Sequence, residues 1–479
     1  MRSLALAQAW IDDGATVHWL ASDLLPPSRD RLSAEGINLE QFEDPVGEEE
    51  DSDKTLRFAN SVNADWVVLD GYAFGALHQA MLKRAGRHVL FVDDNGHAAE
   101  YPADIVLNQN MHASRALYEG KSAGALLLLG PHYALLRREF RRAPRSAKTI
   151  PRVARNILVT LGGGGNAPLA GKIVDALRDL APARGLQVKL IAGGAGLLGE
   201  GDRGGTGDWL SFSRYTEDML SAMVWADLAI SAAGTTACEL MMLGVPSLLI
   251  VAADNQRPIA DRLHEMGIGE NLGPADTLDV GTISRAVEEL AVDPSRRRGM
   301  SERGHAAIDG EGAPRVVRAM RAGLLRLRPA RVDDMRVLWE WANDPEARAV
   351  SFSPAAIPWE DHARWFKTHL GDAGYRILIA ETREAVPVGT VRFERDGEDA
   401  VISVSVDRSS RREGYGRWLI RLGSLEILRS PGVYRIRAYI KPDNAASIRA
   451  FESAGFRYHA PAAVRGQAAL LYTFPEDRP

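Results

Sequence analysis

Few cysteines and no long apolar run restrict where this protein can work. One cysteine, Cys238, occurs among the 479 residues, so no disulfide can form within the chain, which suits a reducing cytoplasm. No stretch of about 18 or more apolar residues occurs, and no basic N-terminal region leads into an apolar core, so neither a membrane span nor a secretion signal is predicted. We therefore expect a cytoplasmic protein.

A strong excess of charge is also missing. The net charge of −5 provides no basic surface for a polyanion, which argues against nucleic acid as a partner. At roughly 150 residues per domain, the length suggests about three domains. The segment 141–155 is basic, contains proline and lacks periodicity, so it is typical of a linker. We predict one unit at 1–140, a second at 156–323 and a third domain at 325–479.

Strands and helices alternate through the first two units, which predicts parallel, doubly wound sheets. The first unit opens on a helix, 1–13, that Gly14 ends, whereas such a sheet normally opens on a strand and a glycine-rich loop. This unit is therefore expected to lack its first strand. The strands that can be read in it lie at 16–21, 65–70, 88–93 and 104–108.

The second unit centres on residues 228–256, which predict a strand, a glycine turn, a helix and a second strand. The turn at Gly234 would present free backbone N–H groups at the positive end of a helix, which suits a phosphate group. The hydroxyls of Thr235 and Thr236 are placed for phosphates, and Glu239, one turn inside the helix, can reach the paired hydroxyls of a ribose. On this stretch alone, an ordinary α/β crossover with a threonine cap has about equal weight.

Other residues of the two units are candidates for a nucleotide or sugar. Gly163 and Gly164 belong to a glycine run after a strand, where backbone can approach a ligand closely, although a flexible turn is as good an interpretation. Asn255 and Gln256 follow a strand end, where side chains can reach a ligand across the crevice. Asp70, also at a strand end, is a candidate to hold the sugar.

Tyr72 shares the DGY motif with Asp70 and is a second candidate, against the alternative of a strand-end turn with a partly buried tyrosine. Asp93 and Asp94 are adjacent, so their side chains should alternate between faces, and no histidine or cysteine lies at ligand spacing. We therefore predict no metal. His97 is more typical of a solvated loop histidine than of a catalytic base.

Two doubly wound units whose glycine turns face a shared cleft make up the GT-B type of architecture. The chain over about 1–320 resembles the UDP-2,4-diacetamido-2,4,6-trideoxy-β-L-altropyranose hydrolase of pseudaminic acid synthesis, and more distantly the peptidoglycan glycosyltransferase that uses UDP-N-acetylglucosamine. The resemblance implies a UDP-linked amino sugar as substrate. It is carried by LALAQAW, VLDGY, VDDNG, DIVLNQN, LLGPHYALLRREF, ILVTLGGGGN and SAAGTTACELMMLGVPSLLIVAADNQ.

The same resemblance implies a catalytic histidine in a G-x-G-H loop between the first strand and the first helix. That loop would precede Met1, since Arg2 matches the arginine of the motif. Either the native protein starts further upstream, which we favour, or this half only binds its ligand. The chain from Met1 is therefore expected to transfer acetyl groups but to release little UDP.

The third domain carries an R-x-x-G-x-G motif, formed by Arg411, Gly414 and Gly416, between a strand at 401–406 and a helix. Backbone N–H groups there can converge on a pyrophosphate. The motif, with the later KPDNAASIRAFESAGF block, resembles the acetyl-CoA site of the GNAT acetyltransferases. The resemblance implies acetyl-CoA as cosubstrate, in contact with Val404, Val406, Arg411, Arg412, Gly414, Tyr415, Gly416, Arg417, Asn444 and Ser447.

Acid and base for acetyl transfer are harder to assign. Phe451 stands where many GNAT enzymes have a tyrosine, so another group or water must protonate the leaving thiolate. Tyr439 and Tyr458 are candidates for the acid, although either can simply pack on the sheet. Glu394 and His362 are candidates for the base.

The leading hypothesis is a bifunctional enzyme that N-acetylates a UDP-linked amino-dideoxy sugar and hydrolyses the product to UDP and free sugar. The fold class is α/β: a GT-B-like pair of Rossmann-type units followed by an α+β GNAT domain. One alternative is an acetyltransferase whose first half only binds UDP-sugar. Others are a non-catalytic nucleotide-sugar binding protein and both activities on a neighbouring sugar. The sequence indicates no oligomeric state.

Overall fold

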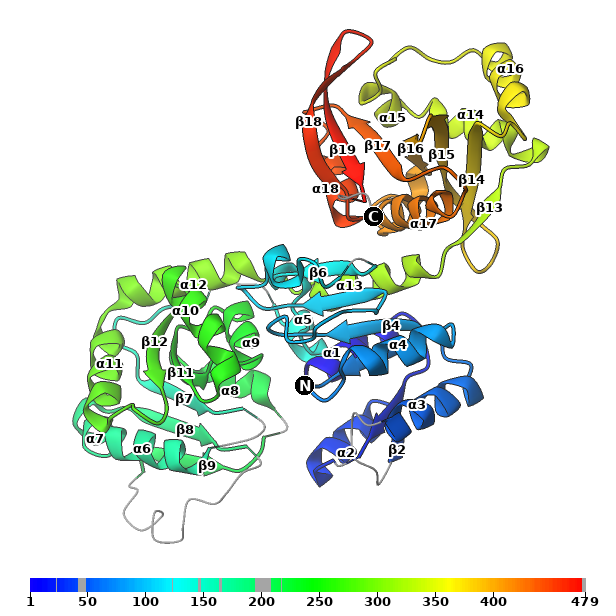
Figure 1. The fold of residues 1–479 in the computed structure, drawn as a ribbon. Helices are drawn as coiled ribbons and strands as arrows, with labels where there is room; N and C mark the ends of the chain where they lie inside the picture. The colour runs from blue at the N-terminus through cyan, green and yellow to red at the C-terminus, as the bar shows by residue number, and fades with distance from the viewer. Residues whose placement is uncertain are drawn as a thin grey trace.

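A computed structural model shows two α/β units with a third domain above them (Figure 1). It describes residues 1–22, 24–41, 49–122, 124–144, 148–162, 166–193, 208–216 and 218–475. Within these ranges, no helix combines the length and the apolar content that crossing a membrane requires.

The first unit consists of short parallel strands and the helices that connect them. Its elements are α1 Arg2–Asp12, β1 His18–Ala21, α2 Pro26–Ala34, β2 Asn38–Gln41, α3 Glu49–Ser61, β3 Trp66–Asp70, α4 Ala76–Arg84, β4 His88–Val92, β5 Ile105–Asn108, η1 Arg115–Tyr118, β6 Leu126–Leu129, η2 Pro131–Tyr133 and α5 Arg138–Arg142. Strands β3, β4, β5 and β6 form one parallel sheet in that order, and β1 and β2 form a separate parallel pair.

The split between these two sheets follows from the order of strands in a doubly wound fold. The usual order places the first strand between the second and the fourth. Here β1 and β2 correspond to the second and third strands of that order, and β3 corresponds to the fourth. Without a first strand between them, β1 and β2 do not pair with β3 and form a separate sheet. Among the described residues, the first unit begins at α1 with no preceding strand, as the sequence predicts.

The second unit has an unbroken parallel sheet with the order β12-β11-β10-β7-β8-β9. Every residue of β10 and β11 is buried, because helices cover both faces of a parallel sheet. Its elements are β7 Asn156–Thr160, α6 Ala167–Leu177, α7 Leu180–Arg184, β8 Gln187–Ile191, β9 Leu210–Ser213, α8 Met219–Trp225, β10 Leu228–Ala232, α9 Thr236–Met242, β11 Ser247–Val251, η4 Asp254–Gln256, α10 Arg257–Glu265, β12 Gly269–Pro274, α11 Val280–Val292 and α12 Pro294–Ala307.

Helix α13, Gly312–Gly323, follows the second unit in the chain but packs on the first. Its buried residues share one hydrophobic core with those of α1, β4 and β5. A Cβ atom on Gly312 would lie 2.2 Å from the carbonyl oxygen of Ala134, so only glycine permits this approach. The division of the chain at residues 140 and 323 stays a prediction.

The third domain is a mixed sheet with the order β13-β14-β15-β16-β17-β19-β18. Residues of β14 alternate between two cores: Ile377 and Ile379 face α14 and α16, while Leu378 and Ala380 face α17. The elements are β13 Arg326–Pro329, η5 Val332–Asp334, α14 Met335–Ala342, α15 Pro345–Ala349, α16 Trp359–His369, β14 Tyr375–Glu381, β15 Pro387–Asp396, β16 Asp399–Val406, η6 Arg408–Ser410, α17 Tyr415–Leu428, β17 Arg435–Ile440, α18 Ala445–Ser453, β18 Arg457–Val464 and β19 Gln467–Phe474.

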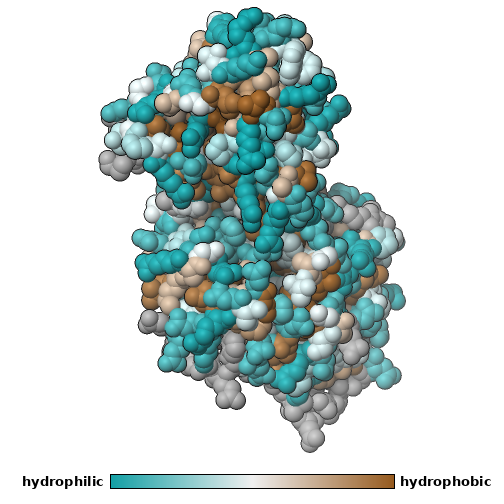
Figure 2. Space-filling view, turned by 90° about the vertical axis from the view of Figure 1, so that its right-hand side faces the viewer, coloured by the Kyte–Doolittle hydropathy of each residue, from teal (hydrophilic) through white to brown (hydrophobic). Residues whose placement is uncertain are grey.

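The third domain rests on the first unit through α17 and α13. The indole Nε1 of Trp418 donates to the carbonyl oxygen of Ala319 at 2.6 Å, and a Cβ atom on Gly323 would lie 2.9 Å from the same indole ring. Further out, Arg383 forms an ion pair with Asp65. Figure 2 shows this domain above a narrow waist, with hydrophobic residues gathered on its face and hydrophilic residues around them.

We predict that Trp418→Ala lowers the free energy of unfolding by about 3–5 kcal/mol, because it empties a buried site and removes the donor to Ala319. Urea unfolding followed by circular dichroism measures the change. Leu425→Ala, on the exposed side of the same helix, is the matched control and should change stability by less than about 0.5 kcal/mol. Equal effects of the two substitutions would contradict the docking role of Trp418.

Candidate functional sites

The first candidate site lies where β16 and β17 separate. These two parallel strands pair only from Asp399 to Val401, opposite Arg435 to Arg437. Beyond that point β17 pairs with β19, and the remainder of β16 pairs with β15. The strands therefore open into a wedge at the end that leads to the R-x-x-G-x-G motif.

The loop between β16 and α17 forms the turn that the motif predicts. Arg412 has a φ of 70° and Gly414 a φ of 85°, and Gly414 is the N-cap of α17. The first N–H groups of a helix have no partner within it, so those of α17 are left without an intrahelical partner at this turn. Arg411 anchors the loop through ion pairs to Asp344 at 2.6 Å and Glu346 at 2.8 Å.

Other expected acetyl-CoA residues surround this turn. The side chains of Val404, Val406 and Tyr415 pack against the core below it. A Cβ atom on Gly416 would lie 3.7 Å from the Val406 side chain, and one on Gly414 would lie 3.2 Å from the Arg417 guanidinium. At the start of α18, the Asn444 side chain accepts a hydrogen bond from the backbone of Ser447.

The acid and base candidates of this domain differ in their surroundings. His362 is buried, its Nε2 bonds the carbonyl oxygen of Met335 at 2.9 Å, and burial lowers its pKa, so it is not placed as a free base. Glu394 is exposed on β15. The Tyr439 hydroxyl accepts from Arg437 at 3.4 Å, and Tyr458 stacks edge-on against Tyr472.

The second candidate site lies between the first two units, where Glu239 meets Arg137. Glu239, in the first turn of α9, is 7% exposed. Arg137 precedes α5, and its guanidinium donates to the Glu239 carboxylate at 2.8 and 3.1 Å. Burial raises the pKa of Glu239, and Arg137 opposes that rise. The expected ribose ligand is thus paired with a residue of the other unit.

A second contact crosses between the same units. The Asn255 side chain donates to the Tyr72 hydroxyl at 2.7 Å, which brings two expected sugar ligands together. Beside them, the Gln256 side chain accepts from the backbone N–H of Ala252, and its amide nitrogen lies 3.8 Å from where a Cβ atom on Gly234 would be.

The turn before α9 is tightly closed by backbone hydrogen bonds. The N–H of Gly234 donates to Ala232, and the N–H of Ala237 donates to Gly234. Thr235 is the N-cap of α9 but makes no capping hydrogen bond with its side chain, and Thr236 is the first residue of the helix. Gly163 and Gly164 lie outside the described residues.

A network of charged groups lines the first unit beside Tyr72. Arg2 forms ion pairs with Asp70 at 2.7 Å and with Asp94 at 2.6 Å. Asp94 also accepts from the Tyr72 hydroxyl at 2.7 Å and from Asn110 at 2.9 Å. Burial raises the pKa of Tyr72 to about 12, with Asp94 adding to the effect. For Asp94, burial is outweighed by Arg2 and these hydrogen bonds, so its pKa is lowered.

Sequence reasoning missed several members of this site. Arg137 has no local signal, because its partner lies 102 positions away. Asp93 and Asp94 have different partners, as expected for adjacent residues, and Asp93 pairs with His97, a contact that the sequence does not predict. Its only signal is the four-residue spacing. Among the described residues, no group of three or more histidine, cysteine, aspartate or glutamate side chains is arranged to hold a metal ion.

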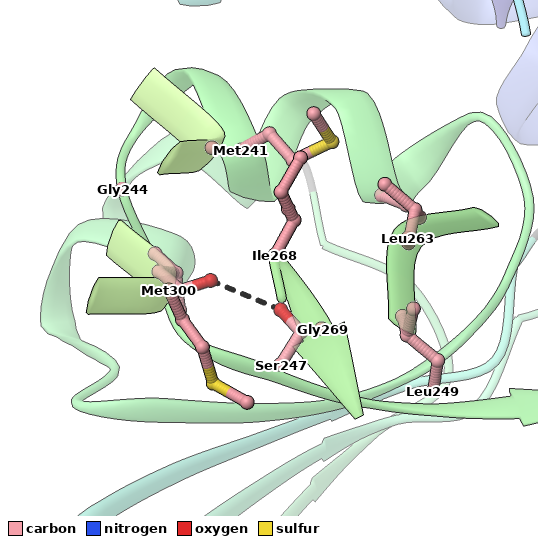
Figure 3. Close-up of a pocket in the computed structure, with 11 residues that line it drawn as sticks. Met241, Gly244, Ser247, Leu249, Leu263, Ile268, Gly269 and Met300 are labelled. Carbon is pink, nitrogen blue, oxygen red and sulfur yellow. Dashed lines mark hydrogen bonds between the residues drawn. The ribbon is translucent and has the colours of Figure 1, made fainter. Parts of the chain in front are cut away.

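Two cavities lie away from both candidate sites. The one in Figure 3 sits behind α9 among Met241, Leu249 and Met300, and its volume of about 10 Å³ has room for no more than one water molecule. In this cavity the Ser247 hydroxyl donates a hydrogen bond to the carbonyl oxygen of Val245 at 3.0 Å. A larger cavity, of about 610 Å³, is lined by the 369–377 segment and the far end of α17.

Comparison with known families agrees with this division into sites. Residues 325–457 match the acetyltransferase (GNAT) domain, and residues 156–311 match the glycosyltransferase family 28 C-terminal domain. The chain thus contains a segment similar to the glycosyltransferase family 28 C-terminal domain, followed by one similar to the GNAT domain.

Individual relatives are distant. The chain is 26% identical over 267 residues to the spore coat polysaccharide biosynthesis protein SpsG of Bacillus subtilis. The aligned region covers 54% of this chain and 77% of that protein. It is 21% identical over 433 residues to an uncharacterized protein of Methanocaldococcus jannaschii, and this alignment covers 85% of this chain and 84% of that protein. A structure of AAC(6')-Ib with paromomycin and acetyl-CoA aligns with 31% of this chain and 92% of its own, at 21% identity and a TM-score of 0.29.

We predict that Gly414→Glu abolishes acetyl-CoA binding, because the added side chain would fill the space above the turn. Isothermal titration with acetyl-CoA tests this. Gly371→Glu is the matched control, since Gly371 also has a positive φ, of 84°, with open space around it, but lies outside the wedge. Acetyl-CoA binding by the Gly414 variant that equals that of the control would contradict the assignment.

We predict that Glu239→Ala weakens UDP binding by about 1.5–3 kcal/mol, as expected for the loss of a charged hydrogen-bond partner. Titration with UDP measures the change. Glu265→Ala removes an exposed carboxylate of α10 that pairs with Arg262, and should leave the UDP affinity unchanged. An unaltered affinity of the Glu239 variant would remove this residue from the nucleotide site.

Proposed function

We propose that this protein acts on UDP-linked amino sugars in two steps, in the manner of pseudaminic-acid-type biosynthesis. The GNAT domain would transfer the acetyl group of acetyl-CoA to an amine of a UDP-amino-dideoxy sugar. The first two units would then hydrolyse the product to UDP and the free 2,4-diacetamido-2,4,6-trideoxy sugar.

The observation that carries the proposal is the separation of β16 from β17, with β16 leading into the loop whose Gly414 is the N-cap of α17. Free N–H groups at a helix start suit a pyrophosphate. The wedge leaves one edge of each strand available to an extended arm such as pantetheine. The match of residues 325–457 to the GNAT domain supports the same role. A primary amine that attacks the thioester carbonyl would form the amide and release coenzyme A as a thiol, after proton transfer to the sulfur.

The nucleotide part of the proposal depends on α9 and its surroundings. The glycosyltransferase 28-like domain and the relative involved in polysaccharide biosynthesis support a nucleotide-sugar ligand. Glu239 would accept hydrogen bonds from the ribose hydroxyls once Arg137 moves aside. Tyr72, Asn255 and Asp70 would contact the sugar from the two sides of the cleft.

A second candidate is an acetyltransferase whose first two units bind a UDP-sugar without hydrolysing it. The ion pair between Arg137 and Glu239 does not separate the two candidates, because each of them must bind the ribose of UDP. A protein of this kind would hold its acetyl acceptor through the UDP group and return it unbroken.

We predict that the protein, incubated with acetyl-CoA and a panel of UDP-amino sugars, adds one acetyl group to at least one of them. Mass spectrometry identifies the product and shows whether it remains linked to UDP. Free acetylated sugar with UDP supports the two-step proposal, and an intact acetylated UDP-sugar supports the second candidate. Failure to bind both acetyl-CoA and UDP in titrations would rule out both enzymes and leave a protein without either activity.

A further inference from the structure

His97 lies in a setting that the sequence does not suggest. It follows β4 in the 93–100 loop, and its Nδ1 lies 2.7 Å from Oδ1 of Asp93. The Asp93 side chain is fully buried, while 29% of the His97 side chain is exposed. The histidine is therefore held from inside the protein and presents its other edge to solvent.

Asp93 is fixed in place by donors on its second oxygen. The Tyr118 hydroxyl and the backbone N–H of Gly96 both donate to Oδ2, each at 2.7 Å. An ionised carboxylate can only accept hydrogen bonds, so Nδ1 of His97 carries a proton. In the neutral ring, Nε2 then has a free lone pair. Among the described residues, none bonds to this Nε2.

His97 lies beside a residue that contacts the second unit. Its ring packs edge-on against Tyr72, with centroids 5.4 Å apart. The Tyr72 hydroxyl is the atom that meets Asn255 of the second unit. His97 is thus next to the point where the two units touch, on the side of the expected sugar ligands.

We propose that His97 is the general base of the hydrolysis and that Asp93 is its positioning residue. The inference rests on the proposed hydrolase function. Buried carboxylate, oriented imidazole and open Nε2 are the parts that base catalysis needs. The chain from Met1 would then hydrolyse UDP-sugar itself, contrary to the expectation from the sequence that it releases little UDP.

The step balances with water as the only co-reactant. Nε2 of His97 takes a proton from water while the water oxygen forms a bond to the anomeric carbon of the sugar. The bond from that carbon to the phosphate oxygen breaks, and its electron pair leaves with UDP. The imidazolium then returns its proton to solvent, which regenerates the base.

The experiment compares His97→Asn with the intact full-length protein on the UDP-sugar that it acetylates. UDP release, UDP affinity and acetyl transfer are measured on the same samples. We expect kcat for UDP release to fall by at least about 100-fold, the lower limit for loss of a general base, with KM, UDP affinity and acetyl transfer unchanged. His132→Asn is the matched control, because this histidine of the same unit is 78% exposed and outside the cleft network.

Asp93→Asn tests the positioning role. An amide nitrogen cannot accept from Nδ1, so the ring would turn or change tautomer, and kcat should fall while KM stays constant. Because Asp93 is buried, acetyl transfer and the thermal melting temperature are checked first. If this variant does not fold, the His97 variant alone decides.

The possible outcomes separate this inference from the proposed function. If the intact protein releases UDP and His97→Asn does so equally fast, His97 is not the base and the hydrolase proposal stands. If His97→Asn loses UDP affinity along with turnover, the residue serves binding and the inference fails. If the intact protein acetylates a UDP-sugar but never releases UDP, both the base and the hydrolase function are overturned.

Discussion

The packing of α13 is the constraint on which the arrangement of the molecule depends. This helix comes after the second unit in sequence, buries its apolar residues in the core of the first, and contacts Trp418 of the third. Its close approaches require small residues, such as Gly312 against Ala134 and Gly323 against Trp418. Because α13 packs on the first unit and contacts the third domain, the relative positions of these two are set by buried contacts.

The same packing brings the candidate acetyl-CoA site to the junction of the units. A Cβ atom on Gly414 would lie 3.7 Å from the carbonyl oxygen of Arg318 in α13, and Arg417 approaches the Tyr133 hydroxyl at 3.5 Å. The turn at Gly414 is therefore next to residues of the first unit. For two consecutive reactions on one sugar nucleotide, such an arrangement keeps the product of one site at high effective concentration for the other.

The elements were predictable where the pattern is local, and the contacts between units were not. Residues 247–251 form a strand as expected, and the glycines at 414 and 416 lie at the helix start that their motif indicates. The strand β2, whose sequence NLEQ is short and mostly exposed, leaves no period to recognise, and the LLLL of β6 fits a strand or a helix equally. The surface on which α13 packs and the residue that pairs with Glu239 are set by residues more than 100 positions away in the sequence. No local pattern encodes such contacts.

The ion pair between Arg137 and Glu239 has a consequence for any nucleotide that binds beside α9. A carboxylate as buried as that of Glu239 is costly without a partner, and breaking a buried pair by removing one member costs about 3–5 kcal/mol. Arg137 also pairs with Glu139 at 3.2 Å, so ribose hydroxyls that took its place at Glu239 would leave the guanidinium with this one carboxylate unless the ligand brings a further acceptor. A diphosphate supplies such an acceptor, whereas a nucleoside does not. We therefore expect the pair to favour ligands that carry both a ribose and phosphate groups over those with the ribose alone.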